Sequence, residues 1–242
     1  MTRIDGRKFD ELRPVTIDAG FVDYAEGSVL ITCGHTKVLC CASVEAGAPR
    51  HVPEGTGWVT AEYSMLPRAN RERSRRDISK LKLSPRSAEI QRLVGRSLRA
   101  AVDMNKLGEH TITIDCDVLQ GDGGTRTASV TGGYIALALA CRRMVELGWI
   151  GESPIRGQVA AVSAGIVEDQ PLLDLCYEED SHAMVDLNCV MNEQGQLVEL
   201  QGTGEGRAFT VQEQQELVAL CQKGIRELLA RQKEILEGAA EK

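Results

Sequence analysis

The amino-acid sequence predicts an α+β protein. Short β-branched and apolar runs, separated by glycine turns, fill the first third of the 242 residues and return after residue 157. Long segments with helical periodicity lie between and after these β-rich stretches. This order indicates two related halves, about residues 1–150 and 155–238, within one unit that spans 1–242. Sheets packed on central helices are the natural arrangement for such a chain.

The first half is expected to hold five strands and two helices. The strands are expected at Val15–Asp18, Gly27–Cys33, Lys37–Val44, Gly57–Tyr63 and Thr111–Leu119. A helix is expected over Pro85–Met104, because its apolar residues share one face and Ser84 can act as its N-cap. The segment Thr127–Leu147 is apolar nearly all round and is expected to be a central, buried helix.

The second half is expected to be a sheet followed by a long helix. Strands are expected at Gln158–Val167, Leu172–Leu175, Ala183–Met191 and Leu197–Gln201, with a hairpin turn at Asn192–Gly195. Thr210 and Glu213 have the spacing of a capping box, which predicts a last helix running to about Leu236.

Composition indicates the cellular compartment in which the protein is expected to act. No apolar run of about 18 residues occurs, so no membrane span or membrane partner is expected. The charged N-terminus lacks an apolar signal segment, which makes the cytoplasm the expected location. Eight cysteines lie mostly in apolar runs and form no C-x-x-C pair, so they are interpreted as small buried hydrophobes in a reducing compartment rather than as a zinc site.

A glycine-rich turn leads into the central helix and has the chemistry of an anion site. The glycines are Gly121, Gly123 and Gly124. They allow a tight turn and a close approach to a ligand, and the helix that follows near Thr125 or Arg126 begins with unpaired N–H groups and a positive dipole end. Arg126 adds donors suited to phosphate oxygens. An ordinary glycine-rich connection is the alternative, and the spacing is not that of a Walker loop.

A second arginine begins the other helix of the first half. Arg86 follows Pro85 at the expected helix start, just as Arg126 lies at the start of the central helix. Two arginines at two helix N-termini point to an anion site more specifically than either residue does alone.

A dense arginine cluster precedes the Pro85 helix. The five arginines are Arg68, Arg71, Arg73, Arg75 and Arg76. The window Leu66–Arg99 holds eleven Lys or Arg and three Asp or Glu, whereas the whole chain has a net charge of −7. The cluster lacks apolar periodicity, so we expect an exposed loop that grips RNA phosphates. The alternative is a solvated charge run.

Two aspartates near the third strand of the second half suggest a metal site. Asp186 lies in an otherwise apolar strand, where a carboxylate is costly unless it is paired or binds a cation, and Asp180 lies where the chain enters that strand. Together they have the chemistry to hold Mg²⁺. Alternatively, Asp186 accepts hydrogen bonds from a loop and Asp180 caps a turn. The nearby glycines of residues 202–206 are interpreted as a plain turn.

Several long motifs together resemble the bacterial ribonuclease PH family over nearly the whole chain. They are the opening DGRKFDELRP at Asp5–Pro14, the strand pair around Leu30–Glu45, the arginine cluster, SPRSAEIQR at Ser84–Arg92, QGDGGTRTAS at Gln120–Ser129, the segment from Glu179 to Asp186, and QGTGEG at Gln201–Gly206. Their shared order along the chain makes the resemblance more specific than any one motif.

The resemblance implies a fold, an assembly and a reaction. The implied fold has two βαβα-type halves in the arrangement of ribosomal protein S5 domain 2, and the implied assembly is a homohexameric ring, a trimer of dimers. The implied reaction is phosphorolysis of RNA from the 3′ end, chiefly of tRNA precursors, which releases nucleoside diphosphates and is reversible. It uses inorganic phosphate as co-substrate and Mg²⁺ as cofactor.

This reaction assigns roles to the candidate residues. Phosphate would be bound by Arg86, Gly124, Thr125 and Arg126. Asp180 and Asp186 would be the catalytic and metal-binding carboxylates, and the arginines of the 68–76 cluster would bind RNA. One rival is a non-catalytic RNA-binding subunit of an exosome-like ring, which would be expected to lose these residues. The other is a hydrolytic metal-dependent nuclease, which would need more carboxylates and has no use for two phosphate-binding arginines.

Overall fold

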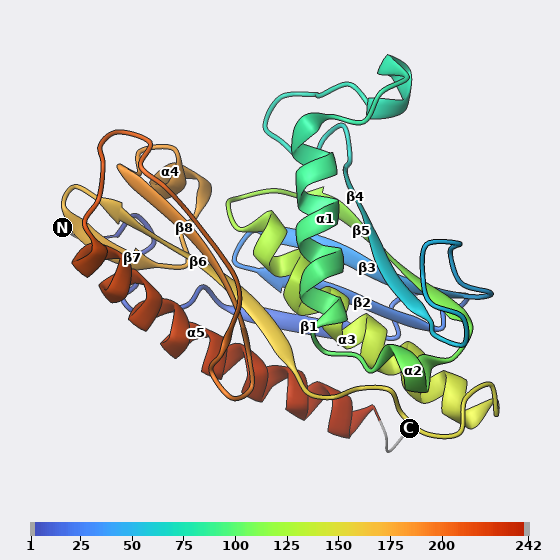
Figure 1. Cartoon of the computed structure of the whole chain (residues 1–242). Helices are drawn as coiled ribbons and strands as arrows, with labels where there is room; N and C mark the ends of the chain where they lie inside the picture. The colour runs from blue at the N-terminus through green and yellow to red at the C-terminus, as the bar shows by residue number, and fades with distance from the viewer. Residues whose placement is uncertain (1–2, 240–242) are drawn as a thin grey trace.

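Two sheets form the framework of the computed structural model, which describes residues 3–239 apart from the side chains of Ile78 and Lys80. The first sheet has the order β1-β2-β3-β5-β4, and only its β4–β5 pair is parallel. The second has the order β7-β6-β8-β9 and is antiparallel throughout. Figure 1 shows the two sheets side by side, with the helices packed on and between them. The prediction of an α+β protein is therefore confirmed.

The first sheet carries alternating side chains, as its sequence predicts. Its strands are β1 (Val15–Ala19), β2 (Gly27–Cys33), β3 (Thr36–Ala46), β4 (Trp58–Met65) and β5 (His110–Gln120). On β5 the buried residues alternate with partly exposed ones, because one face packs on α3 (Thr125–Glu146) and the other faces solvent. Helix α1 (Pro85–Arg99) covers β4 at the edge of this sheet (Figure 1).

The second sheet is enclosed by helices on both faces. Its strands are β6 (Val159–Val167), β7 (Gln170–Leu173), β8 (Val185–Asn192) and β9 (Leu197–Thr203). Every residue of β6 is buried, because α3 packs on one side and α5 (Val211–Gly238) on the other. Helix α3 is thus shared by both sheets, and its first residues lie where the sheets meet. Among the described residues no helix is long and apolar enough to cross a membrane.

The expected caps and turns are present. Ser84 Oγ accepts a hydrogen bond from Ser87 N at 3.0 Å, with Pro85 in the first turn of α1. Thr210 and Glu213 form the expected capping box of α5. The hairpin between β8 and β9 closes through a 3.0 Å bond from Asn192 N to Gln196 O.

The prediction of one helix over Pro85–Met104 is wrong. Helix α1 ends at Arg99, and a separate short helix, α2, spans Met104–Leu107. Between them Val102 forms an isolated bridge with Ile155, and the side chain of Asp103 caps α2 by accepting from Asn105 N at 3.1 Å. These two interactions end the helix before Val102. The local apolar pattern cannot predict the bridge, because its partner, Ile155, lies far along the chain.

Two further short elements were not expected. One is a 3₁₀ turn, η1 (Asp77–Lys80), and the other is α4 (Tyr177–Asp180). Strand β7 also ends earlier than expected, because Asp174 has a left-handed φ of 53° and turns the chain. Because Asp180 is the last residue of α4, it lies at the end of a helical turn rather than directly at the start of β8.

Candidate active site

The glycine turn before α3 has a backbone that requires glycine. Gly123 and Gly124 have φ values of 74° and 64°, and Gly124 is the N-cap of α3. A Cβ on Gly123 would lie 2.6 Å from Leu175 O, and one on Gly124 would lie 2.7 Å from Arg13 Nη2. No side chain of the described residues caps this helix start. Its first N–H groups are therefore suited to binding an anion.

A buried arginine from the beginning of the chain holds this turn. Arg13 donates from Nη1 to Asp122 O at 2.6 Å, and its Nη2 pairs with Asp174 Oδ1 at 2.7 Å. Thr36 Oγ1 donates to Gly123 O at 2.7 Å and accepts from Asp122 N at 2.9 Å. These bonds fix the turn before any ligand binds. Sequence reasoning assigned no role to Arg13 or Asp174, because 161 residues separate them.

Arg126 connects α3 with the second sheet and with α1. From the first turn of α3 its Nη1 donates to Gln201 Oε1 on β9 at 2.6 Å and lies 3.5 Å from Glu89 Oε1 on α1. Its side chain is only 15% exposed, so these partners restrict its orientation. Thr125, beside it, is buried and shares a 2.8 Å hydrogen bond with Tyr63 of β4. Gln201 lies in the strand that the sequence predicts over Leu197–Gln201, and no sequence pattern indicated that its side chain would contact Arg126.

Arg86 lies at the start of α1, as expected, and is exposed. Its positive charge opposes the rise in pKa that burial causes at both Asp180 and Tyr63. Arg126 has the same effect on Asp180. The charges of Arg86 and Arg126, the two arginines predicted to bind phosphate, therefore both act on Asp180, a predicted metal-binding carboxylate.

The two aspartates are close enough to repel each other. Burial raises the pKa of Asp186 to about 6, and the negative charge of Asp180 adds to this rise. Burial also raises the pKa of Asp180. Asp186 projects from β8 on the same side as Asn188, whose Nδ2 donates to it at 3.1 Å. This bond comes from the same strand, β8, and not from a neighbouring loop as the alternative interpretation of Asp186 had it.

This carboxylate pair has the chemistry to bind a hard divalent cation. Asp186 is half-buried and Asp180 is exposed. Two such carboxylates with raised pKa values lose a mutual repulsion when a cation binds between them. Across the described residues, no group of three or more His, Cys, Asp or Glu side chains is arranged to hold a metal ion. A cation held by Asp180 and Asp186 would have only two protein carboxylates, and its other oxygens would have to come from water or substrate.

The N-terminal segment also fixes α4, which carries Asp180. Arg3 is 4% exposed, and its Nη2 pairs with Glu179 Oε2 at 2.7 Å. Glu179 in turn accepts from Cys176 N at 3.1 Å, which closes the capping box of α4. Arg3 and Arg13 thus hold the two segments that carry the predicted carboxylate and the predicted anion site.

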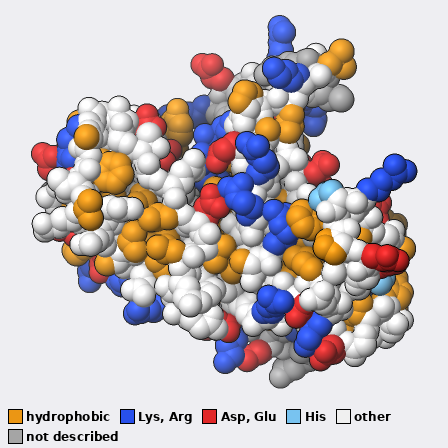
Figure 2. Space-filling view, viewed as in Figure 1, with side chains coloured by type: hydrophobic (Ala, Val, Ile, Leu, Met, Phe, Trp, Pro, Cys, Tyr) orange, Lys and Arg blue, Asp and Glu red, His pale blue; other side chains and the backbone are white. Residues whose placement is uncertain are grey.

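The arginine cluster lies on a projecting loop next to the glycine turn. Its members Arg68, Arg71, Arg73, Arg75 and Arg76 are all exposed. The base of the loop is anchored by buried Ala69, whose carbonyl accepts from Gly121 N at 2.9 Å. In Figure 1 this loop and η1 extend beyond the sheets above α1, and Figure 2 shows Lys and Arg side chains along α1 and on this projection.

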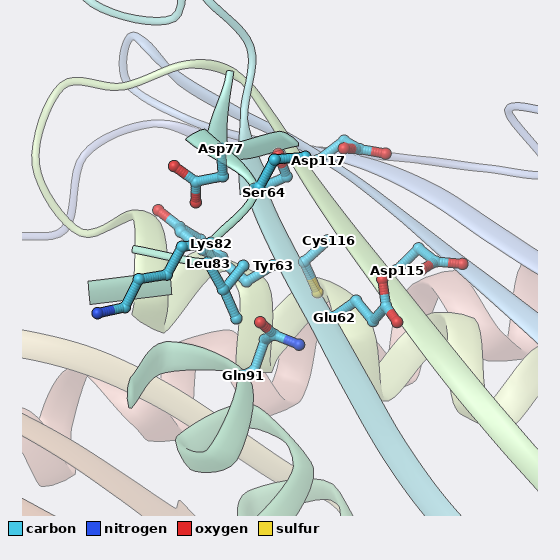
Figure 3. A pocket seen from close by; sticks show the side chains of 11 residues that line it. Glu62, Tyr63, Ser64, Asp77, Lys82, Leu83, Gln91, Asp115, Cys116 and Asp117 are labelled. Atoms are coloured by element: carbon cyan, nitrogen blue, oxygen red, sulfur yellow. The ribbon is translucent and has the colours of Figure 1, made fainter. Parts of the chain in front are cut away.

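An acidic hollow lies on the outer face of the first sheet. It has a volume of about 500 Å³, and Glu62, Asp115 and Asp117 project from β4 and β5 at its wall (Figure 3). Burial raises the pKa of Asp115, and the charges of Glu62 and Asp117 raise it further. Carboxylates of like charge make this hollow unsuitable for RNA phosphates, in contrast to the region around Arg86 and Arg126.

Comparison with known proteins covers nearly the whole chain. Models of the 3′ exoribonuclease family match residues 11–142 with domain 1 and residues 157–224 with domain 2. Ribonuclease PH of Bacillus subtilis (strain 168) is 56% identical over 97% of this chain and 96% of its own length. Ribonuclease PH of Moorella thermoacetica is 52% identical over 98% and 95% of the two chains.

Solved structures share the fold. A chain of an archaeal exosome core has a TM-score of 0.78 at 26% identity, covering 96% of this chain and 91% of that one. A chain of the Archaeoglobus fulgidus exosome with RNA bound to the active site has a TM-score of 0.78 at 27% identity, covering 95% and 92%. The chain therefore belongs to the 3′ exoribonuclease family, and its similarity to curated relatives places it with the bacterial ribonuclease PH proteins.

Proposed function

We propose that this protein is a phosphate-dependent 3′–5′ exoribonuclease that trims tRNA precursors and releases nucleoside diphosphates. The observation that carries the proposal is the combination of an uncapped, glycine-led helix start and Arg126 with two mutually repelling carboxylates. The helix start and Arg126 suit the binding of inorganic phosphate, and the two carboxylates suit a cation beside a phosphodiester. The identity of 52–56% to ribonuclease PH proteins supports the same activity.

The proposed reaction exchanges one phosphorus–oxygen bond for another. An oxygen of inorganic phosphate attacks the phosphorus of the last phosphodiester, and the bond from that phosphorus to the 3′ oxygen of the preceding nucleotide breaks. The last nucleotide leaves as a nucleoside diphosphate, and the 3′ oxygen takes up a proton. Because a diester is replaced by an anhydride rather than by free acid, the reaction runs readily in reverse as nucleotidyl transfer.

Binding and orientation account for most of the catalysis in this proposal. Arg86, Arg126 and the N–H groups at Gly124–Arg126 would hold the attacking phosphate in line, and Thr125 would complete its binding site. Asp180 and Asp186 would hold Mg²⁺, which when bound would neutralise charge on the scissile phosphate. Either Asp186 or a water molecule beside the cation would supply the proton to the leaving 3′ oxygen.

The proposed setting is a cytoplasmic ring acting on RNA 3′ ends. All eight cysteines are free and seven are buried, which suits a reducing compartment. For its assembly we propose a homohexameric ring built as a trimer of dimers, which the resemblance to the ribonuclease PH family implies. The arginine cluster on the projecting loop would grip the body of the tRNA.

The product of the reaction tests the proposed function. Purified protein with a short RNA, Mg²⁺ and inorganic phosphate is expected to release nucleoside diphosphates, and to release little without phosphate. Phosphate-independent release of nucleoside monophosphates would instead identify a hydrolytic nuclease. Tight RNA binding with no product in either condition would identify a non-catalytic ring subunit.

A further inference from the structure

A pocket of about 400 Å³ lies beside the glycine turn and has no role in the mechanism above. Its lining comes from the arginine loop, the glycine turn and α4, and consists of Asn70, Arg71, Glu72, Gly121, Asp122 and Tyr177. The first two segments carry the proposed RNA-binding and phosphate-binding groups, and the third carries Asp180. The pocket is therefore next to the position proposed for the scissile phosphate.

The position of Tyr177 is fixed by the glycine turn. A Cβ on Gly123 would lie 2.9 Å from Tyr177 N, so the two backbones are in close contact. The pocket's other wall is fixed as well, because Gly121 N donates to Ala69 O at the base of the arginine loop. Tyr177 and Asp180 are the first and last residues of α4, and residues three apart lie on the same side of a helical turn.

The side chain of Tyr177 is 52% exposed, which is unusual for a ring so close to the proposed active site. Aromatic residues are scarce, at 4% of the chain. The other exposed aromatic rings, Phe9, Phe21, Tyr24 and Trp149, do not line this pocket. An exposed ring and an arginine that line one pocket can both bind a nucleobase, the ring by π-stacking and the guanidinium by a cation–π contact.

We propose that Tyr177 is the stacking platform for the base of the 3′-terminal nucleotide, in a pocket that Arg71 also lines. This inference rests on the proposed function and adds the subsite that holds the nucleotide being removed. In the reverse reaction the same pocket holds the base of the nucleoside diphosphate. Every base has a flat π-face, so stacking tolerates any base, as an enzyme that removes successive nucleotides requires.

A substrate without its terminal base tests this role directly. The measurement is kcat/KM for phosphorolysis of a five-nucleotide RNA and of the same RNA ending in an abasic ribonucleotide. On the intact RNA, Tyr177→Ala is expected to lower kcat/KM by about 5-fold to 150-fold, the equivalent of one lost stacked base. On the abasic RNA the variant and the unaltered protein are expected to be equal. Tyr177→Phe, which keeps the ring, is expected to recover most of the loss.

Tyr24→Ala is the matched control, since Tyr24 is fully exposed and lies outside the pocket. A second readout needs no turnover: an RNA ending in 2-aminopurine, without phosphate, is expected to lose fluorescence on binding the unaltered protein and much less on binding Tyr177→Ala.

Two results would overturn the inference. An equal loss on intact and abasic RNA would show that Tyr177 only supports the glycine turn, and no loss on intact RNA would show that no base stacks there. If the unaltered protein released no nucleoside diphosphate, the proposed function would fail instead. The fluorescence measurement would then still decide whether Tyr177 stacks on a terminal base.

Discussion

Arg126 donates a 2.6 Å hydrogen bond from Nη1 to Oε1 of Gln201, across the boundary between the two sheets. Gln201 lies opposite Asn188 in the β8–β9 ladder, and Asn188 in turn donates to Asp186. A short series of side chains therefore connects the proposed phosphate-binding arginine to the proposed metal-binding carboxylate. The packing of α3 against the second sheet sets the distance between these groups, so the site depends on both halves of the chain.

Replacing Arg126 is expected to impair catalysis without unfolding the protein. Arg126→Ala removes a donor directed at charge that moves during phosphoryl transfer, and loss of one such donor lowers turnover by about a hundredfold or more. The measurement is phosphorolysis of a short RNA over a range of phosphate concentrations. Arg143→Ala, an exposed arginine near the other end of α3, is the control and is expected to behave as the unaltered protein. Full activity of Arg126→Ala would refute the phosphate-site assignment.

Neutralising either aspartate is expected to abolish Mg²⁺-dependent cleavage while RNA still binds. Asp180→Asn and Asp186→Asn keep the size of each side chain and remove a negative charge from the proposed cation site. Turnover is measured over a Mg²⁺ titration, and RNA binding by fluorescence anisotropy. Normal turnover of either variant across the titration would show that the residue is structural.

The buried arginine–carboxylate pairs are expected to make stability depend on pH in the acidic range. Burial alone would raise the pKa values of Asp174 and Glu179, but Arg13 and Arg3 outweigh this and lower them. A lowered pKa in the folded state stabilises the protein above the unfolded values of about 3.9 for Asp and 4.3 for Glu. That stability is lost as the pH falls through the folded pKa values. Urea denaturation midpoints should therefore decline below about pH 4.5.

Asp174→Asn separates this effect from general acid denaturation. It leaves Arg13 buried without its charged partner, which is expected to cost about 3–5 kcal/mol at pH 7. The cost relative to the unaltered protein should shrink as the pH falls, because Asp174 itself then becomes protonated. Glu146→Gln, at an exposed ion pair, is the control and should change stability little. A cost independent of pH would contradict the assignment.

The sequence predicted what depends on local pattern and missed what depends on distant contacts. Strand β5 follows from its alternation, and α3 from its apolar run and the preceding glycines. The role of Arg13 could not be predicted, because Asp122 and Asp174, which it contacts, lie 109 and 161 residues away. Likewise α4 is a single turn held by the contact of Glu179 with Arg3, and it left no periodic signal.

The arginine loop is expected to bind tRNA and to take no part in the chemistry. Arg68, Arg73 and Arg76 are exposed on a projection whose base is joined to the glycine turn by the backbone bond from Gly121 N to Ala69 O. Changing all three to Ala is expected to weaken tRNA binding and flatten its salt dependence. Each lost phosphate contact removes about 0.7 to 0.9 from the slope of log affinity against log salt concentration.

Turnover on a short RNA separates tRNA binding from chemistry, because such a substrate is expected to reach the site and the pocket at Arg71 without lying along Arg68, Arg73 and Arg76. The triple variant is expected to retain most of this activity while tRNA trimming falls. The matched control replaces three exposed basic residues elsewhere, Lys106, Arg231 and Lys233, and is expected to change neither. If the loop variant lost both activities equally and kept its salt slope, the loop would belong to the active site or to a subunit interface. The division between a binding loop and a catalytic centre at Arg86, Arg126, Asp180 and Asp186 would then be wrong.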